Sequence, residues 1–441
     1  MAVSSAEFAR CDARSETFAQ QIRLLVLRGI LVLIVAGSQI GMLIVAGIYV
    51  QQGRLEDMVT PEAVTGVIAI ALALLVVRIH PRVDLKDAVF PWLLAFLVYA
   101  SVSELVRPDL RLGNVSTFIS IAAFYLIGRT VGSNVVRREG VRIPVTSVLL
   151  AIYVCWYMAM LVFMVRGDLG FYGVLPYSNL ARLQFTEGFR ATEIAIHVGF
   201  QLPVLLYVLL NVRSAAQRIT AILLLVCATV FVIATASVAA LMAIAIVLLV
   251  FLFARIGLSM RTLAIATAAS VIVGIGLISV FKDGILAATQ AKVEDYEAGE
   301  GARAFIYAEL AGYILTEPLG IGKGRFVENN TLSWSDKSVF PHQNFLGIGA
   351  ELGVPAMILF FCFAVSGFVV LARRAWSKSQ LIPREVKMVA AVGLAMFVFQ
   401  QFRGLFQDTW TFRETYFWLG LSVGATAFMK GNRKPTEEGS P

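Results

Sequence analysis

The sequence predicts an all-α integral membrane protein with about twelve transmembrane helices, and three observations support this. Of its 441 residues, 58% are hydrophobic and only 15% are charged, whereas soluble domains are about half apolar and about a quarter charged. Apolar runs of about 20 residues, the length that crosses ~30 Å of hydrocarbon as a helix, recur along the chain. Lys and Arg are also divided unevenly between alternate loops. We therefore predict a single polytopic membrane domain spanning residues 1–441.

Twelve apolar segments are predicted to span the membrane. The first is too long for the apolar region of a cleaved signal peptide and is expected to be retained. The run from Ile219 to Ala254 is too long for one crossing, and small and hydroxylated residues at 234–237 permit a tight turn there. The predicted spans are 24–50, 63–78, 88–106, 115–132, 144–165, 194–212, 218–235, 237–254, 262–281, 344–372, 388–402 and 414–429.

The distribution of basic residues predicts which loops lie inside the cell. With a cytoplasmic N-terminus, 23 of the 37 Lys and Arg residues fall in inner segments and 14 in outer segments, although the outer segments include the two longest loops. This bias is typical of inward-facing loops, and it predicts that both termini are cytoplasmic. The net charge of +8 is thus explained by topology, and no nucleic-acid partner is expected. The four cysteines form no disulfide framework.

Two outer loops, 166–193 and 282–341, are long, and loops of this length are usually either functional or disordered; the larger one is not of low complexity. The larger one contains an amphipathic stretch, residues 303–315, which is suited to lie along the membrane surface. The stretch 318–326 then interrupts it. Its Gly320–Gly324 portion is rich in glycine but matches neither the Walker A nor the Rossmann spacing, so it is a weak phosphate-binding signal.

His342 is the first candidate catalytic residue, because it is one of only three histidines and stands between a polar loop and an apolar helix. A neutral imidazole can accept a proton from a hydroxyl group. The alternative is that His342 caps the helix that begins near Asn344. Gln343 and Asn344 follow it as supporting residues. Glu351 lies in the same predicted helix, where a carboxylate is costly unless it is paired or faces a cavity, so it either orients His342 through a neighbour or holds an arginine.

Arginines in the long outer loops are candidate ligands for a lipid diphosphate. A guanidinium group grips phosphate oxygens in pairs, although interfacial arginines also extend towards headgroups without any substrate role. Arg190 and Arg303 rank first, followed by Arg182 and Arg325. No Cys, His or carboxylate cluster has the spacing of metal ligands, and no Ser–His–Asp hydrolase signature is found. Neither a metal nor another cofactor is therefore expected.

Residues 342–353 resemble the signature of the O-antigen ligase and O-antigen polymerase superfamily. In that signature a loop histidine is followed by Asn or Ser, then by a Leu four residues on, then by Glu-Leu-Gly; this chain has Gln343 where Asn or Ser is usual. Residues 303–326 resemble the segment that precedes the histidine: an Arg, a helix and a Pro–x–Gly–x–Gly stretch. One departure is Val238, which stands where many members have an arginine in a Ser-Arg-x-Ala stretch.

The resemblance implies a metal-independent, inverting membrane glycosyltransferase in the bacterial inner membrane. Its donor would be a glycan on a polyprenyl (undecaprenyl) diphosphate, and its acceptor a sugar hydroxyl of a glycan or of lipid A–core at the periplasmic face. The arginines would hold the diphosphate and stabilise the charge of the leaving group, while His342 accepts the acceptor's proton. Ligase and polymerase differ in acceptor and are left open. Membrane lipids are expected partners, and a polymerase would also have a chain-length regulator protein as a partner.

Two other functions compete with this hypothesis. A secondary transporter would place ionisable residues and broken helices near the bilayer midplane, whereas the polar residues here gather at the predicted outer face. A non-catalytic scaffold of envelope polysaccharide export would tolerate the loss of His342.

Overall fold

The structure is a computed structural model of the 441-residue chain. It describes residues 20–37, 39, 68, 71–76, 78, 87–108, 111–136, 144–174, 181–185, 191–211, 214–235, 238–256, 303–329, 341, 343–377, 382, 384–405 and 409–426.

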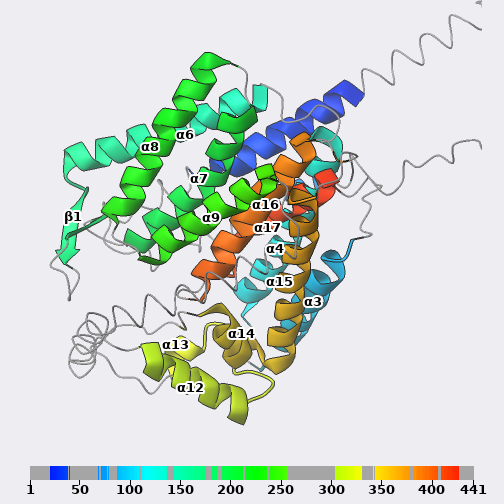
Figure 1. Cartoon of the computed structure of the whole chain (residues 1–441). Helices are drawn as coiled ribbons and strands as arrows, with labels where there is room; N and C mark the ends of the chain where they lie inside the picture. The colour runs from blue at the N-terminus through cyan, green and yellow to red at the C-terminus, as the bar shows by residue number, and fades with distance from the viewer. Residues whose placement is uncertain are drawn as a thin grey trace, which may run out of the picture.

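Helices make up nearly all of this part of the chain (Figure 1). An N-terminal helix runs from Gln20 to Gly37. The later elements are α3 (Phe90–Leu105), α4 (Leu112–Val131) with a π-helical turn (Gly132–Val136), α6 (Pro144–Arg166), β1 (Leu169–Val174), β2 (Ala181–Phe185), α7 (Ala191–Asn211), α8 (Ala215–Ala234), α9 (Val238–Ile256), α12 (Arg303–Thr316), α13 (Phe326–Asn329), α14 (Asn344–Leu352), α15 (Val354–Ala375), α16 (Arg384–Arg403) and α17 (Arg413–Thr426).

The helices confirm the predicted class. Among the described residues, six helices are long and apolar enough to cross a membrane, and shorter apolar helices accompany them. The break between α8 and α9 falls where the sequence predicted a tight turn, since α8 ends at Ala234 and α9 begins at Val238. The span predicted at 262–281 lies outside the described residues, as do residues 40–50 of the first span and half of 63–78, so the total of twelve stays a prediction.

Two features differ from the sequence prediction. The first long loop contains an antiparallel hairpin of β1 and β2, in which Leu169 pairs with Phe185. The span predicted at 344–372 is two helices, because Gly353 adopts a positive φ of 95° and ends α14. A Cβ at Gly353 would lie 2.6 Å from the backbone carbon of Leu319, so only glycine allows this close approach.

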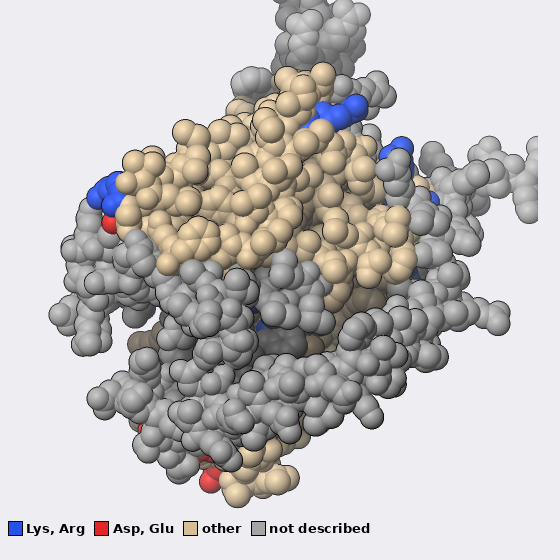
Figure 2. All heavy atoms as spheres, turned by 60° about the vertical axis from the view of Figure 1, so that its left-hand side comes forward, with Lys and Arg blue, Asp and Glu red and all other residues tan. Residues whose placement is uncertain are grey.

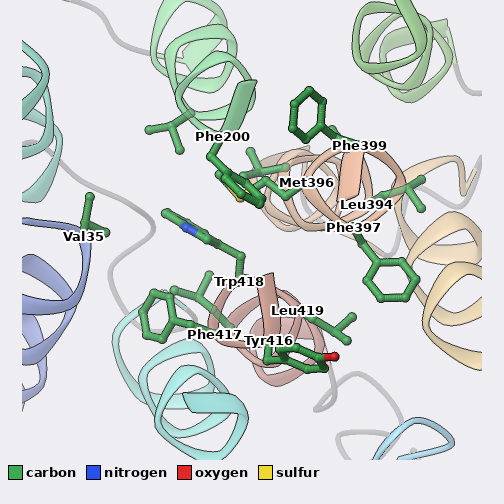
Figure 3. Packing of buried hydrophobic residues seen from close by; sticks show 14 of the residues in the cluster. Val35, Phe200, Leu394, Met396, Phe397, Phe399, Tyr416, Phe417, Trp418 and Leu419 are labelled. Carbon is green, nitrogen blue, oxygen red and sulfur yellow. The ribbon is translucent and has the colours of Figure 1, made fainter. Parts of the chain in front are cut away.

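The surface and the core are both those of a membrane bundle. Figure 2 shows a broad face of uncharged residues with Lys and Arg gathered towards its edges. On α8, exposed apolar side chains recur at helical spacing, as contact with lipid tails requires: Ile219, Leu223, Val226, Val230 and Ile233. Inside, Figure 3 shows Phe200 of α7 beside Phe399 of α16, and Trp418 of α17 near both helices; the rings of Phe200 and Phe399 are 5.6 Å apart.

Helices α4 and α17 are in direct backbone contact through glycines. A Cβ at Gly128 would lie only 2.0 Å from the Phe417 carbonyl oxygen. Each helix carries two glycines four residues apart, the arrangement that lets membrane helices approach closely. The other three glycines with such contacts are Gly132 (2.0 Å from Leu421 O), Gly420 (2.2 Å from Tyr125 O) and Gly424 (2.1 Å from Arg129 O).

Candidate functional site

Polar and charged residues gather at one end of the bundle, which we name the loop end. It comprises residues 104–108, 111–114, 317–329, 343–346, 403–405 and 409–413 together with the helix starts that these segments join. Figure 1 shows α12 and α13 lying beside α14 at this end, away from the long helices α6 to α9. The residues of α12, α13 and α14 pack together through a small apolar cluster of their own, formed by Ile306, Leu310, Phe326 and Ala350.

The glycine-rich segment 320–324 is anchored to the end of α14 through its backbone. The Ile321 N–H donates to the Ala350 carbonyl oxygen at 2.9 Å, and the Gly322 N–H donates to the Glu351 carbonyl oxygen at 2.7 Å. A phosphate-binding loop must turn its N–H groups towards the ligand. Because these two N–H groups are already bound, they cannot form such a cradle, and the weak phosphate-loop signal is explained by a structural turn.

Side chains of α3 and α4 hold the same segment from the other side. The buried carboxylate of Glu104 accepts the Lys323 N–H at 2.7 Å and the Asn114 side-chain amide at 3.0 Å. Asn114 also donates to the Lys323 carbonyl oxygen at 3.1 Å. Arg107 donates to the Gly320 carbonyl oxygen at 2.5 Å. The loop backbone is therefore fixed by helix side chains.

The side chain of Lys323 turns towards the junction of α4 and α17. Its ammonium group lies 5.8 Å from the ring centroid of Phe118 and 5.6 Å from that of Trp410, within the range of cation–π attraction. Arg413, at the start of α17, donates from Nε to the Ser120 hydroxyl at 2.7 Å. Two cations thus reach the same stretch of α4.

The start of α14 is tied to the turn between α16 and α17. Gln343 is the N-cap of α14 and its side chain accepts the Leu346 N–H. Asn344 is buried; its Oδ1 accepts the Thr409 N–H at 2.8 Å and the Trp410 N–H at 3.2 Å. The Asn344 N–H donates to the Gly404 carbonyl oxygen at 2.7 Å. These bonds give Gln343 and Asn344 structural roles in fixing the start of this helix.

Helix α12 begins beside the same turn. The Tyr307 hydroxyl contacts the Leu405 carbonyl oxygen at 3.4 Å, next to the Gly404 carbonyl that receives Asn344. Arg303, the first residue of α12, precedes Tyr307 by about one helical turn. Near the other end of α12, the Tyr313 hydroxyl donates to Asn329 O at 2.7 Å. Burial, followed by the nearby Glu309 carboxylate, raises the pKa of Tyr313, which keeps this donor protonated.

The structure places the predicted site residues in different ways. His342 and Arg190 lie outside the described residues, as do the side chains of Arg182 in β2 and Arg303. The remaining two predicted residues are Arg325, predicted to bind the diphosphate, and Glu351, predicted to support the site. Arg325 is half-buried beside Gly322, and Glu351 is buried near the end of α14. Glu351 is seven residues after Asn344, which corresponds to about 10 Å along the helix axis. It is thus beside the glycine-rich segment and away from the start of α14.

Sequence reasoning missed Glu104 and Asn114 and underrated Lys323. A signal for Glu104 was present: it is a carboxylate inside the predicted span 88–106, where an ionisable residue is costly and usually functional. The pairing of Asn114 with Lys323 joins residues 209 positions apart, and no local pattern predicts it.

The fold and the loop end define a multi-pass membrane protein whose polar groups converge at one end of an apolar bundle. Residues 223–361 match the family described as O-antigen ligase, which confirms the relationship to the O-antigen ligase and polymerase superfamily and supports a function of that general type. The match runs from within α8 to within α15 and includes α12, the glycine-rich segment and α14. The curated proteins searched contain no match to this chain.

Proposed function

We propose that this protein is a glycosyltransferase that moves a glycan from a polyprenyl diphosphate to a sugar hydroxyl at the periplasmic face, as a polymerase or a ligase. One observation carries the proposal: α12 and α14 begin beside the same turn, where Leu405 accepts from Tyr307 and Gly404 accepts from Asn344. Arg303 is the first residue of α12, and His342 precedes Asn344 by two residues. Both belong to the region that matches the O-antigen ligase family.

In the proposed reaction, His342 takes the proton of the acceptor hydroxyl while the oxygen of that hydroxyl attacks the anomeric carbon of the donor sugar. The bond between that carbon and the diphosphate oxygen breaks, and its electron pair leaves with the diphosphate. Attack from the opposite face inverts the anomeric configuration. Arg303 and Arg190 stabilise the negative charge of the leaving diphosphate, since preorganised cations act most strongly where charge develops.

The alternative role for His342, capping α14, is weakened by the geometry of that helix. Gln343 occupies the N-cap position and its side chain accepts the Leu346 N–H. A helix has one N-cap residue, so the cap does not require the imidazole. This favours a chemical role for His342.

The central test is His342→Ala, assayed by in vitro transfer from a purified lipid-linked donor. Loss of a general base lowers the rate by about 10²- to 10⁴-fold, whereas loss of a helix cap costs about 1 kcal/mol of stability. We expect near-complete loss of transfer with normal expression and membrane insertion. His80→Ala, which changes a histidine outside the proposed site, should stay active. Near-normal transfer by His342→Ala would favour the scaffold alternative.

The arginines are tested by charge-conserving variants. Lysine keeps the charge but not the planar two-point contact with phosphate. Arg303→Lys and Arg190→Lys should each lose most activity, while Arg54→Lys, in the short first outer loop, should change little. Equal activity of the three variants would mean that these arginines only contact headgroups.

The orientation is tested by cysteine labelling. In a background whose four native cysteines are replaced by serine, Asn330→Cys should react with an impermeant reagent added from the periplasmic side. Labelling that requires access to the cytoplasm would reverse the proposed topology.

A further inference from the structure

We infer that the ammonium group of Lys323 contacts the donor's diphosphate in addition to the arginines, and that Glu104 and Asn114 are the residues that position Lys323. This inference rests on the proposed function and adds to it a binding group from the glycine-rich segment. In the glycine-rich segment, the backbone N–H groups of Ile321 and Gly322 are bound to α14. The group of this segment that we propose for binding the diphosphate is therefore the Lys323 side chain.

The backbone of Lys323 is held in place by hydrogen bonds. Both of its backbone polar groups are held: the N–H by Glu104 at 2.7 Å and the carbonyl oxygen by Asn114 at 3.1 Å. The two holding side chains also bind each other at 3.0 Å, so the three residues form a closed set. Glu104 is 0% exposed, and a buried carboxylate is tolerated only with such partners. Bonds to an ionised acceptor are short and strong, so this arrangement restricts movement of the Lys323 backbone.

The side chain of Lys323 is directed towards two aromatic rings. Gly322 and Gly324 flank Lys323 and have positive φ values of 110° and 77°, which bend the chain on either side of it. A lysine at a membrane surface usually extends its ammonium group into water. Here the ammonium group lies over Phe118 and Trp410, both of which are buried. The ring faces favour a positive charge at this point and hold it at the α4–α17 junction.

Arg413 is a second cation near the Lys323 ammonium group's contacts on α4. Trp410 is three residues before Arg413, and Phe118 is two residues before Ser120, to which Arg413 donates at 2.7 Å. Lys323 and Arg413 therefore reach neighbouring parts of α4 from two different segments. An ammonium group and a guanidinium fork that reach the same turn of one helix offer two cations to a ligand with two linked phosphates.

The test measures kcat and KM for the lipid-linked donor and for the acceptor, using the full-length protein in phospholipid-free detergent. Lys323→Gln should lower donor kcat/KM by about 10- to 100-fold, the effect of losing one charged hydrogen bond, and leave the acceptor KM unchanged. Lys323→Arg should recover much of this loss. Glu104→Gln keeps an acceptor for the Lys323 N–H but turns an amide towards the Asn114 amide, so it should show a smaller loss in the same donor parameter.

The matched control is Glu328→Gln, a change from carboxylate to amide in α13, the short helix that follows the glycine-rich segment. Glu328 pairs with Arg111 at 2.6 Å, but the two side chains are 54% and 39% exposed, and such pairs contribute little. Its kinetics should stay near wild type. If Glu104 had only a structural role, Glu104→Gln would lower the melting temperature and change donor and acceptor parameters equally, which would overturn the positioning role.

Other outcomes separate this inference from the proposed function. Binding of radiolabelled polyprenyl diphosphate should weaken by about 10- to 100-fold in Lys323→Gln, and this supports the contact even if the wild type transfers no glycan. Equal binding and equal donor kcat/KM in an active wild type and Lys323→Gln would refute it. A defect that arises only when anionic phospholipid vesicles are added would assign Lys323 to headgroups and refute the donor contact.

Discussion

Helices α4 and α17 pack against each other from Ser120 and Arg413 to Gly132 and Gly424, and the two ends of the pair are built differently. At the loop end, α4 carries Asn114 and Ser120, whose side chains bind groups of other segments: Asn114 binds the backbone of Lys323, and Ser120 accepts from Arg413. At the opposite end, which we name the tight end, the two helices touch through the backbones of Gly128, Gly132, Gly420 and Gly424.

The tight end also contains a buried ion pair. Asp87 and Arg129 form a salt bridge, and each side chain is 2% exposed. Asp87 further accepts the Val89 and Phe90 N–H groups at 2.7 and 2.6 Å and so binds the backbone at the start of α3. Tyr125 reaches the same carboxylate at 3.3 Å.

The comparison shows how one helix pair separates stability from binding. At the tight end, polar groups satisfy one another inside the protein, and helices meet without intervening side chains. At the loop end, Glu104 of α3 and Asn114 of α4 hold the backbone of Lys323. The rings of Phe118 and Trp410 then set the position of its ammonium group. Substitutions of the packed residues at the tight end should therefore affect stability, and substitutions of the loop-end residues that hold or direct Lys323 should affect transfer.

The largest stability effect is expected for Arg129→Met. It leaves the Asp87 carboxylate buried without its main partner, which costs about 3–5 kcal/mol. Thermal unfolding in detergent should show a large decrease in melting temperature. Asp87→Asn combined with Arg129→Met should recover part of the loss, because the uncompensated charge is removed. A single variant as stable as wild type would mean that the ion pair does not stabilise this end.

Gly128→Val should have the next largest effect. The added atoms would occupy space within about 2.0 Å of the Phe417 carbonyl oxygen, so α4 and α17 must separate. Overpacking of this kind costs about 1–3 kcal/mol. The melting temperature should fall, while donor KM of the protein that remains folded should stay unchanged. A large increase in donor KM without loss of stability would contradict the separation between the two ends.

Asn344→Ala tests a residue of the loop end that has a structural role. It removes the acceptor for the Thr409 and Trp410 N–H groups, and a buried group left unsatisfied costs about 1–3 kcal/mol. The turn between α16 and α17, to which Asn344 ties the start of α14, also carries Trp410, and the Lys323 ammonium group lies over the Trp410 ring. We therefore expect a moderate loss of stability together with a loss of transfer, measured by thermal unfolding and the transfer assay. Unchanged values in both assays would contradict the tether.

Local patterns predicted much of this fold and less of the site. Apolar length located the described spans, and the small residues near 235 located the break between α8 and α9. The break at Gly353 was missed because its cause is distant: the approach of Leu319 to the α14 end. The same limit applies to Glu104, whose partner Lys323 is 219 residues away. Periodicity gives the face of a helix, but it does not give the loop that packs on that face.

The smallest expected effect belongs to Gly113→Ala, which changes the glycine of α4 at the loop end. Nothing lies within 4 Å of a Cβ built at this position, so the methyl group meets no backbone, in contrast to Gly128. Alanine is favoured over glycine in a helix by up to about 1 kcal/mol, and less is expected in the first turn. We therefore expect a melting temperature equal to or slightly above that of wild type, with unchanged transfer. Opposite signs for the two glycine substitutions, in one helix and in one assay, would establish that α4 is packed tightly at one end only. A decrease in stability at both positions would show that the loop end is packed as closely as the tight end.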